Sequence, residues 1–131
     1  MNDHPSTEAD LEDEEFGRTA SNLLRGYLRL YVLELLQERP HSGSEIASHL
    51  VHTCAWKPSP GSIYPLLKHL EEQGLAESRW EIGDRPRRVY ALTEEGSKER
   101  MQLRDKLEPQ LRRTLRMLEI HIDYLFGRDP R

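Results

Sequence analysis

The fold is most strongly indicated by residues 59–74, which read SPGSIYPLLKHLEEQG. Ser59 can cap a helix, the proline after it suits the first helical position, and the closing glycine is typical of a helix end. Four apolar residues recur at helical spacing between these limits and form the face expected to be buried: Ile63, Leu66, Leu67 and Leu70. Pro65 costs a helix interior about 3 kcal/mol, so Ser62 could instead be the cap, after an irregular first turn. The segment predicts a short helix whose first residue stays open.

Two helices are predicted before this segment. Residues 23–36 carry apolar side chains on nearly every side of a helical wheel, which predicts a helix buried on most faces, and Pro40 ends it. Ser42 and Glu45 have the spacing of a capping box, and apolar residues then recur at helical spacing up to Val51. A short second helix is therefore expected to start at this box.

A β-hairpin is predicted after residue 74. From Ala76 to Ile82, small or apolar residues alternate with charged ones, which is the pattern of a strand with one covered face. Residues 83–86, Gly-Asp-Arg-Pro, favour a turn, and the chain from there to Thr93 reads as the returning strand. Thr93 can then cap the element that follows.

The last predicted element is a helix over residues 94–126 that contains Pro109, which should kink it or divide it in two. At 1.5 Å per residue the helix would span about 50 Å, more than a core of this size can cover. Its apolar residues lie three or four apart along one seam: Leu103, Leu107, Leu111, Leu115, Leu118, Ile122 and Leu125. Such a seam predicts contact with a second chain.

Composition separates the first residues from the rest. The chain has 131 residues, enough for one domain, and 36% of them are hydrophobic. Residues 1–17 hold seven acidic side chains and neither Lys nor Arg, so a disordered acidic tail is expected there. When those seven are taken from the 23 acidic residues, 16 remain against 19 basic ones, a balance of +3. The expected units are a folded domain over 18–93, the helix over 94–126 and a flexible end over 127–131.

Several functional classes are not favoured by the sequence. No apolar run is long enough to span a bilayer and the acidic start is unlike a signal peptide, so a cytoplasmic protein without membrane contact is expected. No phosphate loop, nucleophile elbow or His–carboxylate cluster indicates an enzyme or a cofactor. His49, His52 and Cys54 could suggest a metal site, but a fourth ligand is lacking nearby, and a surface role is the simpler interpretation.

Three helices followed by a hairpin is the order of a winged helix, in which the third helix enters the major groove of DNA and the hairpin lies beside the phosphate backbone. Opposite its buried face, the predicted third helix offers small, basic and aromatic residues, and the hairpin turn adds three guanidiniums that can reach phosphates. A solvated turn is the alternative interpretation of those arginines. The candidate DNA contacts are Ser59, Gly61, Ser62, Tyr64, Lys68 and His69 from the helix and Arg85, Arg87 and Arg88 from the hairpin.

The sequence also resembles a known family. The likeness runs over about residues 24–96 and is carried mainly by LRG at 24–26, SPGSIYPLL at 59–67 and LTEEG at 92–96. Together these segments resemble the PadR-type transcriptional regulators. The family usually has His-Gly-Tyr-Glu at the start of the second helix, where this chain has SGSE at 42–45, so no role of that His or Tyr carries over.

The resemblance implies a function and partners. PadR-type proteins dimerise through their first and last helices, so the chain is expected to be a homodimer that binds an inverted-repeat operator in double-stranded DNA and represses transcription. A small-molecule effector of unknown identity is a further expectation, whereas Trp56 and Trp80 are expected to have core or surface roles. The alternative is a winged-helix module for protein interaction, with weak or no specific DNA binding.

Overall fold

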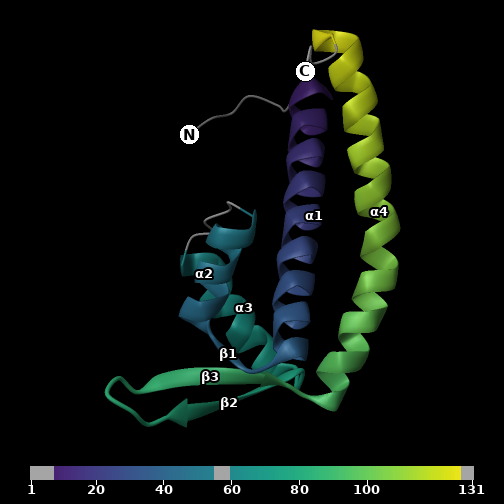
Figure 1. Cartoon of the computed structure of the whole chain (residues 1–131). Helices are drawn as coiled ribbons and strands as arrows, with labels where there is room; N and C mark the ends of the chain where they lie inside the picture. Colours follow the sequence, from purple (N-terminus) through teal and green to yellow (C-terminus); the bar gives the residue numbers. More distant parts are fainter. Residues whose placement is uncertain (1–7, 55–59, 128–131) are drawn as a thin grey trace, which may run out of the picture.

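The computed structural model describes residues 8–54 and 60–127. Figure 1 shows α2 and α3 beside the lower part of α1, the strands beneath them, and α4 running back along α1. The strands form one antiparallel sheet in the order β1-β3-β2. The elements along the chain are α1 (Glu8–Glu38), β1 (His41–Ser42), α2 (Gly43–Cys54), α3 (Pro60–Glu72), β2 (Ala76–Glu81), β3 (Arg87–Leu92) and α4 (Glu94–Phe126).

The core lies where α1, α2 and α3 meet above the sheet. The buried face predicted for α3 is confirmed, because Leu66 is half-buried and the other three residues of that face are fully buried. Pro65 lies inside α3, and the helix begins at Pro60. Three helices followed by a hairpin confirm the predicted winged-helix fold. The largest fully buried side chains are Val32, Leu33, Ile46, Leu50, Ile63, Leu67 and Leu70.

The predicted capping box at the start of α2 is present. The backbone N–H of Glu45 donates to Ser42 Oγ at 3.2 Å, and the N–H of Ser42 donates to Glu45 Oε1 at 3.2 Å. Just before the helix, His41 and Ser42 pair with Tyr90 and Val89 of β3. This strand, β1, adds a third strand to the predicted hairpin. It was not predicted, because two residues are too few to show the alternation of a strand.

The hairpin of β2 and β3, here called the wing, is only partly covered. Its register runs from the pair Ala76↔Leu92 to the pair Glu81↔Arg87. Ala76 is buried, whereas Trp80 is 65% and Ile82 is 94% exposed. The prediction of one covered face is therefore wrong for the outer half of the wing, which projects past the helices (Figure 1).

The start of α4 is fixed against the turn that precedes the wing. Thr93 is the N-cap of α4, and its Oγ1 accepts a hydrogen bond from the Gly96 N–H at 3.0 Å. Gly96 is buried, and a Cβ at this position would lie 2.0 Å from the carbonyl oxygen of Leu75. The backbone of Leu75 thus leaves no room for a side chain at residue 96. Farther along, α4 continues through Pro109 as one helix, so the predicted division does not occur.

The first helix begins earlier than the sequence predicts. α1 starts at Glu8, which corrects the expectation of a disordered tail over residues 1–17; residues 1–7 lie outside the described part of the chain. Glu, Ala and Leu, which recur from residue 8 onward, favour helix. Low hydrophobicity alone therefore was not sufficient to predict disorder here.

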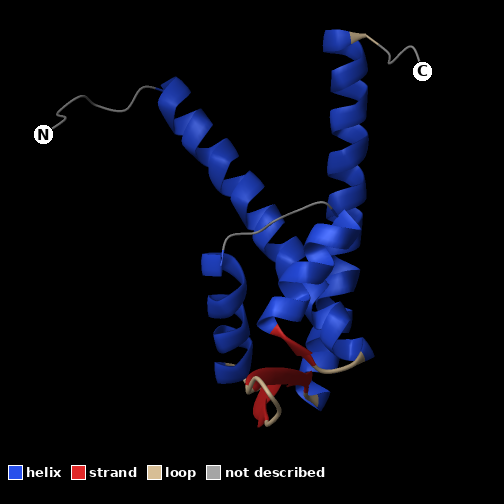
Figure 2. Cartoon of the chain, turned by 60° about the vertical axis from the view of Figure 1, so that its left-hand side comes forward, coloured by secondary structure: helices blue, strands red, loops and turns tan. Residues whose placement is uncertain are grey.

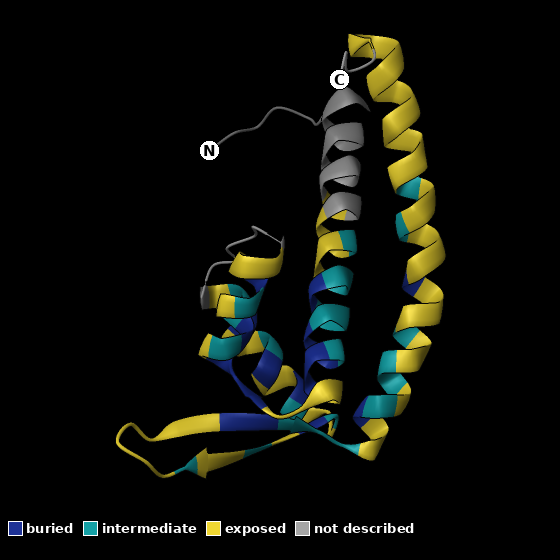
Figure 3. Ribbon diagram, in the orientation of Figure 1, coloured by how far each residue is buried: buried dark blue, intermediate teal, exposed yellow. Residues whose placement is uncertain are grey.

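The two long helices meet at one end and diverge at the other. Near the sheet, Arg100 Nη1 donates to Glu34 Oε1 at 2.9 Å and Ser97 Oγ donates to Gln37 Oε1 at 2.9 Å. Figure 2 shows the start of α1 and the end of α4 spreading apart like a V. Residues 115–126 of α4 are exposed, and Figure 3 shows this end of the helix in yellow. We call residues 111–126, the last turns of α4, the α4 arm.

The predicted apolar seam of α4 is divided between two environments. Leu107 is buried beside Gly26 of α1, where a Cβ would lie 3.4 Å from Leu107 Cδ1, and Leu103 packs against the core. Both are therefore covered by their own chain, which corrects the expectation of a seam open along its whole length. Leu111 is half-buried. The rest of the seam is exposed and consists of Leu115, Leu118, Ile122 and Leu125.

Candidate nucleic-acid interface

The outward face of α3 is the first part of the candidate interface. Gly61, Lys68 and His69 are exposed, as the sequence predicts. Tyr64 is 54% exposed, and its ring also lies on α2, since a Cβ at Gly43 would be 2.6 Å from Tyr64 Cε1. Tyr64 thus fixes α3 against α2 while presenting part of its surface to solvent. Of the other candidates on this helix, Ser62 is half-buried and Ser59 lies outside the described residues.

Two candidate cations remain unpaired in the described structure. Lys68 is exposed near the middle of α3, and Arg85 is exposed in the turn of the wing. Within residues 8–54 and 60–127, neither side chain makes an ion pair or hydrogen bond. Their charges are therefore available to an external anion such as a phosphate.

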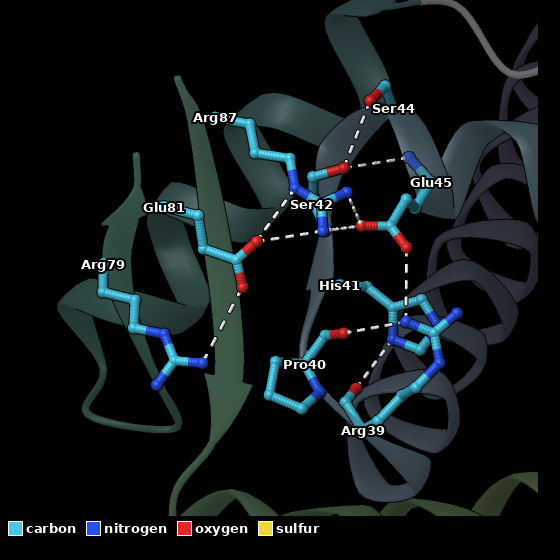
Figure 4. A network of polar contacts seen from close by, with 9 residues as sticks. All are labelled: Arg39, Pro40, His41, Ser42, Ser44, Glu45, Arg79, Glu81 and Arg87. Carbon is cyan, nitrogen blue, oxygen red and sulfur yellow. Dashed lines mark hydrogen bonds and ion pairs between the residues drawn. The ribbon is translucent and has the colours of Figure 1, made fainter. Parts of the chain in front are cut away.

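Arg87, by contrast, belongs to a network within the chain (Figure 4). Its Nη1 lies 2.6 Å from Glu45 Oε1 at the start of α2, and its Nη2 lies 3.0 Å from Glu81 Oε2 on the neighbouring strand. Arg39 adds a contact of 3.2 Å to the other oxygen of Glu45, and Arg79 lies 3.8 Å from Glu81. The network thus connects the first turn of α2 to the wing.

The network also alters the acidity of its members. Burial opposes the charge on Glu45, but the Ser42 N–H, Arg39 and Arg87 outweigh this effect and hold the pKa of the Glu45 carboxyl below its usual value. The hydrogen bond to Glu81 and the charge of Glu45 raise the pKa of Arg87. Both groups are thus more firmly ionised in the folded chain than in isolation.

Arg88 ties the other side of the wing to α3. Its Nη2 lies 2.8 Å from Glu71 Oε1, its Nε donates to Ser78 Oγ at 2.9 Å, and its guanidinium carbon lies 5.5 Å from the centre of the Tyr90 ring. Ser78 also donates to Glu71. Arg88 therefore orients the wing relative to the end of α3.

The acidic partners of these arginines were missed by the sequence reasoning. Glu81 could have been found, because it lies directly opposite Arg87 in the predicted hairpin, and opposite charges pair across strands. Glu45 and Glu71 come from other elements and depend on how the wing packs. Of the three arginines predicted to contact DNA, Arg85 alone is without an ion pair in the described structure.

The other polar candidates do not gather into a second site. His49 Nδ1 contacts the hydroxyls of Tyr31 and Thr53, and His52 is exposed. The part of the chain that the structure describes contains no group of three metal-ligating side chains. Among those same residues, no helix is long and apolar enough to cross a membrane.

Known proteins resemble the chain in sequence and in structure. Residues 32–102 match the model of the transcriptional regulator PadR-like family. The chain is 34% identical over 94 residues to the Escherichia coli transcriptional regulator YqjI, in a match that covers 70% of this chain and 44% of that protein. The chain thus spans less than half the length of that relative.

Solved structures share the fold. A PadR family transcriptional regulator from Eggerthella lenta superposes with a TM-score of 0.62 at 28% identity, over 81% of this chain and 90% of that one. A transcriptional regulator from Clostridium thermocellum superposes with a TM-score of 0.66 at 24% identity, over 72% of this chain and 96% of that one. The second likeness concerns the fold alone.

Proposed function

Because the chain belongs to the PadR-like family of transcriptional regulators, which are not enzymes, we propose that it represses transcription by binding an inverted-repeat operator as a homodimer. The observation that carries this proposal is the pair of unpaired cations, Lys68 on α3 and Arg85 on the wing. A winged helix places its third helix in the major groove and its wing beside the backbone, where such cations meet phosphates.

The exposed α4 arm supports a homodimer. Leu115, Leu118, Ile122 and Leu125 lie on one side of this arm and are each 47% to 66% exposed. Exposure of so many large apolar side chains on one helix is unfavourable in water, and a second copy of the arm would cover them. In the proposed dimer a two-fold axis would relate the two α3 helices, and we expect half-sites about one helical turn apart, as in other helix-turn-helix dimers.

The proposed dimer supports repression as the mode of regulation. A dimer that occupies two successive major grooves excludes other proteins from that stretch of promoter. An effector that alters the angle between α1 and α3 would change the spacing of the two α3 helices. A groove of about 550 Å³ between these helices, lined by Leu24, Arg25 and Leu66 among others, offers room for a small molecule.

The experiment that tests the proposal removes the two unpaired cations. A duplex is first selected by the purified protein from a random library, and its dissociation constant is measured at several salt concentrations. In the double variant Lys68→Ala, Arg85→Ala, four contacts per dimer are lost, so the slope of log K against log salt should become shallower by about 4. The control is Lys98→Ala, an exposed cation at the start of α4.

The outcomes separate the two functional classes. Weaker binding with a shallower slope in the double variant, and unchanged binding in Lys98→Ala, is the result expected of a DNA-binding repressor. Equal slopes in all three proteins, or a library selection that yields no preferred sequence, would contradict the proposal and favour the protein-interaction module. Arg87 and Arg88 are unsuitable for this test, because their loss would also release the wing.

A further inference from the structure

The strand at the edge of the sheet has one free side. In the sheet order β1-β3-β2, β2 (Ala76–Glu81) pairs with β3 on one side, and within residues 8–54 and 60–127 no strand lies on its other side. Figure 1 shows β2 along the lower edge of the molecule, with its outer half beyond the helices. Every second residue of an edge strand directs its backbone N–H and C=O outward, where a further strand can bind them. The free side of β2 is here called the β2 edge.

The outer half of β2 also exposes apolar side chains. Trp80 is 65% exposed, and Ile82, directly after the strand, is 94% exposed. Both lie on the same side of the strand as Ser78, because residues two apart share a side. Edge strands are commonly protected from pairing by lysine, proline or a bulge. β2 contains neither lysine nor proline, and its register with β3 is unbroken from Ala76 to Glu81, so the β2 edge lacks these protections.

The opposite side of the strand carries two charges of opposite sign. Arg79 and Glu81 both lie there, and Arg79 Nη2 is 3.8 Å from Glu81 Oε1 (Figure 4). The other oxygen of Glu81 is held by Arg87 at 3.0 Å. The Arg79 side chain is 70% exposed, and such exposed ion pairs are weak. Arg79 and Glu81 Oε1 can therefore exchange this contact for one with another chain.

The segment Arg79-Trp80-Glu81 is complementary to itself in antiparallel pairing. When Trp80 of two copies lie opposite each other, each Arg79 is opposite the Glu81 of the other copy. A register shift of one residue would place Trp80 opposite Arg79 or Glu81 and would mix the apolar side with the charged side. A shift of two would place Arg79 opposite Arg79 or Glu81 opposite Glu81, and like charges directly opposite each other are destabilising. Among these registers only the first is complementary.

We propose that the β2 edge pairs antiparallel with the β2 edge of a second copy, with the two Trp80 side chains opposite each other, and that this contact joins neighbouring dimers on DNA. The strand pairing needs no DNA, whereas its role on DNA rests on the proposed function. The α4 arm ends at the opposite end of the molecule from the wing, so a chain can use both contacts at once (Figure 1). Two dimers on adjacent operators would be held close together, and a weak contact then suffices to make their binding cooperative.

The first test measures association in the absence of DNA. In sedimentation velocity over a range of concentrations, wild-type dimers should associate into species of four or more chains. In Arg79→Glu, each strand contact would contain two pairs of glutamates directly opposite each other, so the dissociation constant of this association should rise about tenfold or more. Trp80→Ala should weaken the association as well. The matched control is Glu77→Lys, which reverses an exposed charge on the same side of β2 but lies opposite Gly83 in this register and should have no effect.

A second measurement locates the contact. In the strand pairing, the outward-facing amides of β2 gain hydrogen bonds, so their hydrogen exchange should slow as the concentration of wild type rises. The slowing should affect alternate amides of β2 and should be absent in Arg79→Glu. Because Glu77, Arg79 and Trp80 are exposed, the midpoint of thermal unfolding should be the same in all variants, which excludes misfolding as the cause.

The role on DNA is tested with duplexes that carry two adjacent copies of the selected operator, at spacings that differ by whole helical turns. Wild-type dimers should fill the second site at a lower concentration than the first, and Trp80→Ala should fill the two sites independently. The readout is the ratio of the two dissociation constants, so a change in affinity for a single operator does not affect it.

The outcomes distinguish this inference from the proposed function. Wild-type dimers that do not associate, or association that Arg79→Glu and Glu77→Lys weaken equally, would overturn the strand pairing. Association as predicted, but independent filling of the two operators by wild type, would overturn its role on DNA. Failure to select any operator would overturn the proposed function, while the measurements without DNA would still decide the strand pairing.

Discussion

In the winged-helix body, Leu33, Leu67 and their neighbours are completely buried, whereas in the α4 arm Leu118, Ile122 and Leu125 are 47% to 66% exposed. The same residue type thus meets two environments in one chain. In the body, the apolar core is buried and the helix caps and ion pairs are formed within a single chain. The arm is not covered in this way, because its seam is exposed from Leu115 to Leu125 in the described chain, in agreement with the yellow end of α4 in Figure 3.

The comparison indicates that the two regions have separate tasks. Substitutions in the body should alter the free energy of unfolding, and substitutions in the arm should alter association between chains. Four predictions, from the largest effect to the smallest, test how sharp this separation is.

The largest effect is expected in the arm. In Leu118→Asp, Ile122→Asp, two carboxylates would be buried in the dimer contact, so the dimer dissociation constant should rise by about a thousandfold or more. Sedimentation equilibrium measures this constant. Glu119→Ala, on the same turn but outside the seam, is the control and should remain dimeric. A double variant that stays dimeric would show that the seam is not the contact.

The next largest effect is expected in the body. Leu67→Ala should lower the free energy of unfolding by about 2–5 kcal/mol, because a fully buried side chain leaves a cavity. Urea denaturation of the monomeric arm variant gives the comparison without dissociation. In that background Leu125→Ala should change the free energy by well under about 1 kcal/mol. Equal losses at the two positions would refute the division into body and arm.

A third prediction concerns the joint between body and α4. Gly96→Ala should destabilise the fold by about 1–3 kcal/mol, because its Cβ would meet the Leu75 carbonyl oxygen and force backbone apart. Gly83→Ala is the matched control, since no atom lies within 4 Å of a Cβ there. Thermal unfolding of both variants measures the difference. Equal stability of the two variants would mean that the backbone around Leu75 moves at little cost to make room for the Cβ.

The smallest effect is a pH dependence of the network that joins Glu45 at the start of α2 to Arg87 and Glu81 of the wing. The pKa of Glu45 is lowered by folding, so its stabilising contribution is complete above the ordinary carboxyl pKa and is lost as the pH falls through the lowered value. The stability difference between wild type and Glu45→Gln should therefore shrink toward zero on acidification below about pH 4.5. A difference that stays constant with pH would argue that Glu45 contributes no charge to the network.

Much of the fold could be predicted because local chemistry marks its elements. The capping box at residue 42, the cap at Thr93 and the turn at 83–86 all act within a few residues, and each appears in the structure. The predicted bounds of α4 agree with those observed. These features depend on hydrogen bonds and backbone preferences that neighbours in sequence determine.

The errors arise where distant elements meet. Arg87 and Arg88 look free in the sequence, but Glu45 and Glu71 reach them from α2 and α3. Alternation predicts a covered face for β2, yet how far the wing extends past the body decides that Trp80 is exposed. Leu107 looks like part of a continuous seam until α1 is placed against it. Periodicity predicts which side of a helix or strand is apolar. Whether that side is covered, and by which element, depends on tertiary packing.

The central claim is that two chains joined through the α4 arm bind one duplex through α3 and the wing. It is tested most directly by the mass of the complex, measured by sedimentation with a duplex selected from a random library. The account predicts two chains per duplex for the wild type, and loss of the complex in Leu118→Asp, Ile122→Asp at concentrations where that variant remains folded. One chain per duplex, or equally tight binding by the monomeric variant, would contradict it.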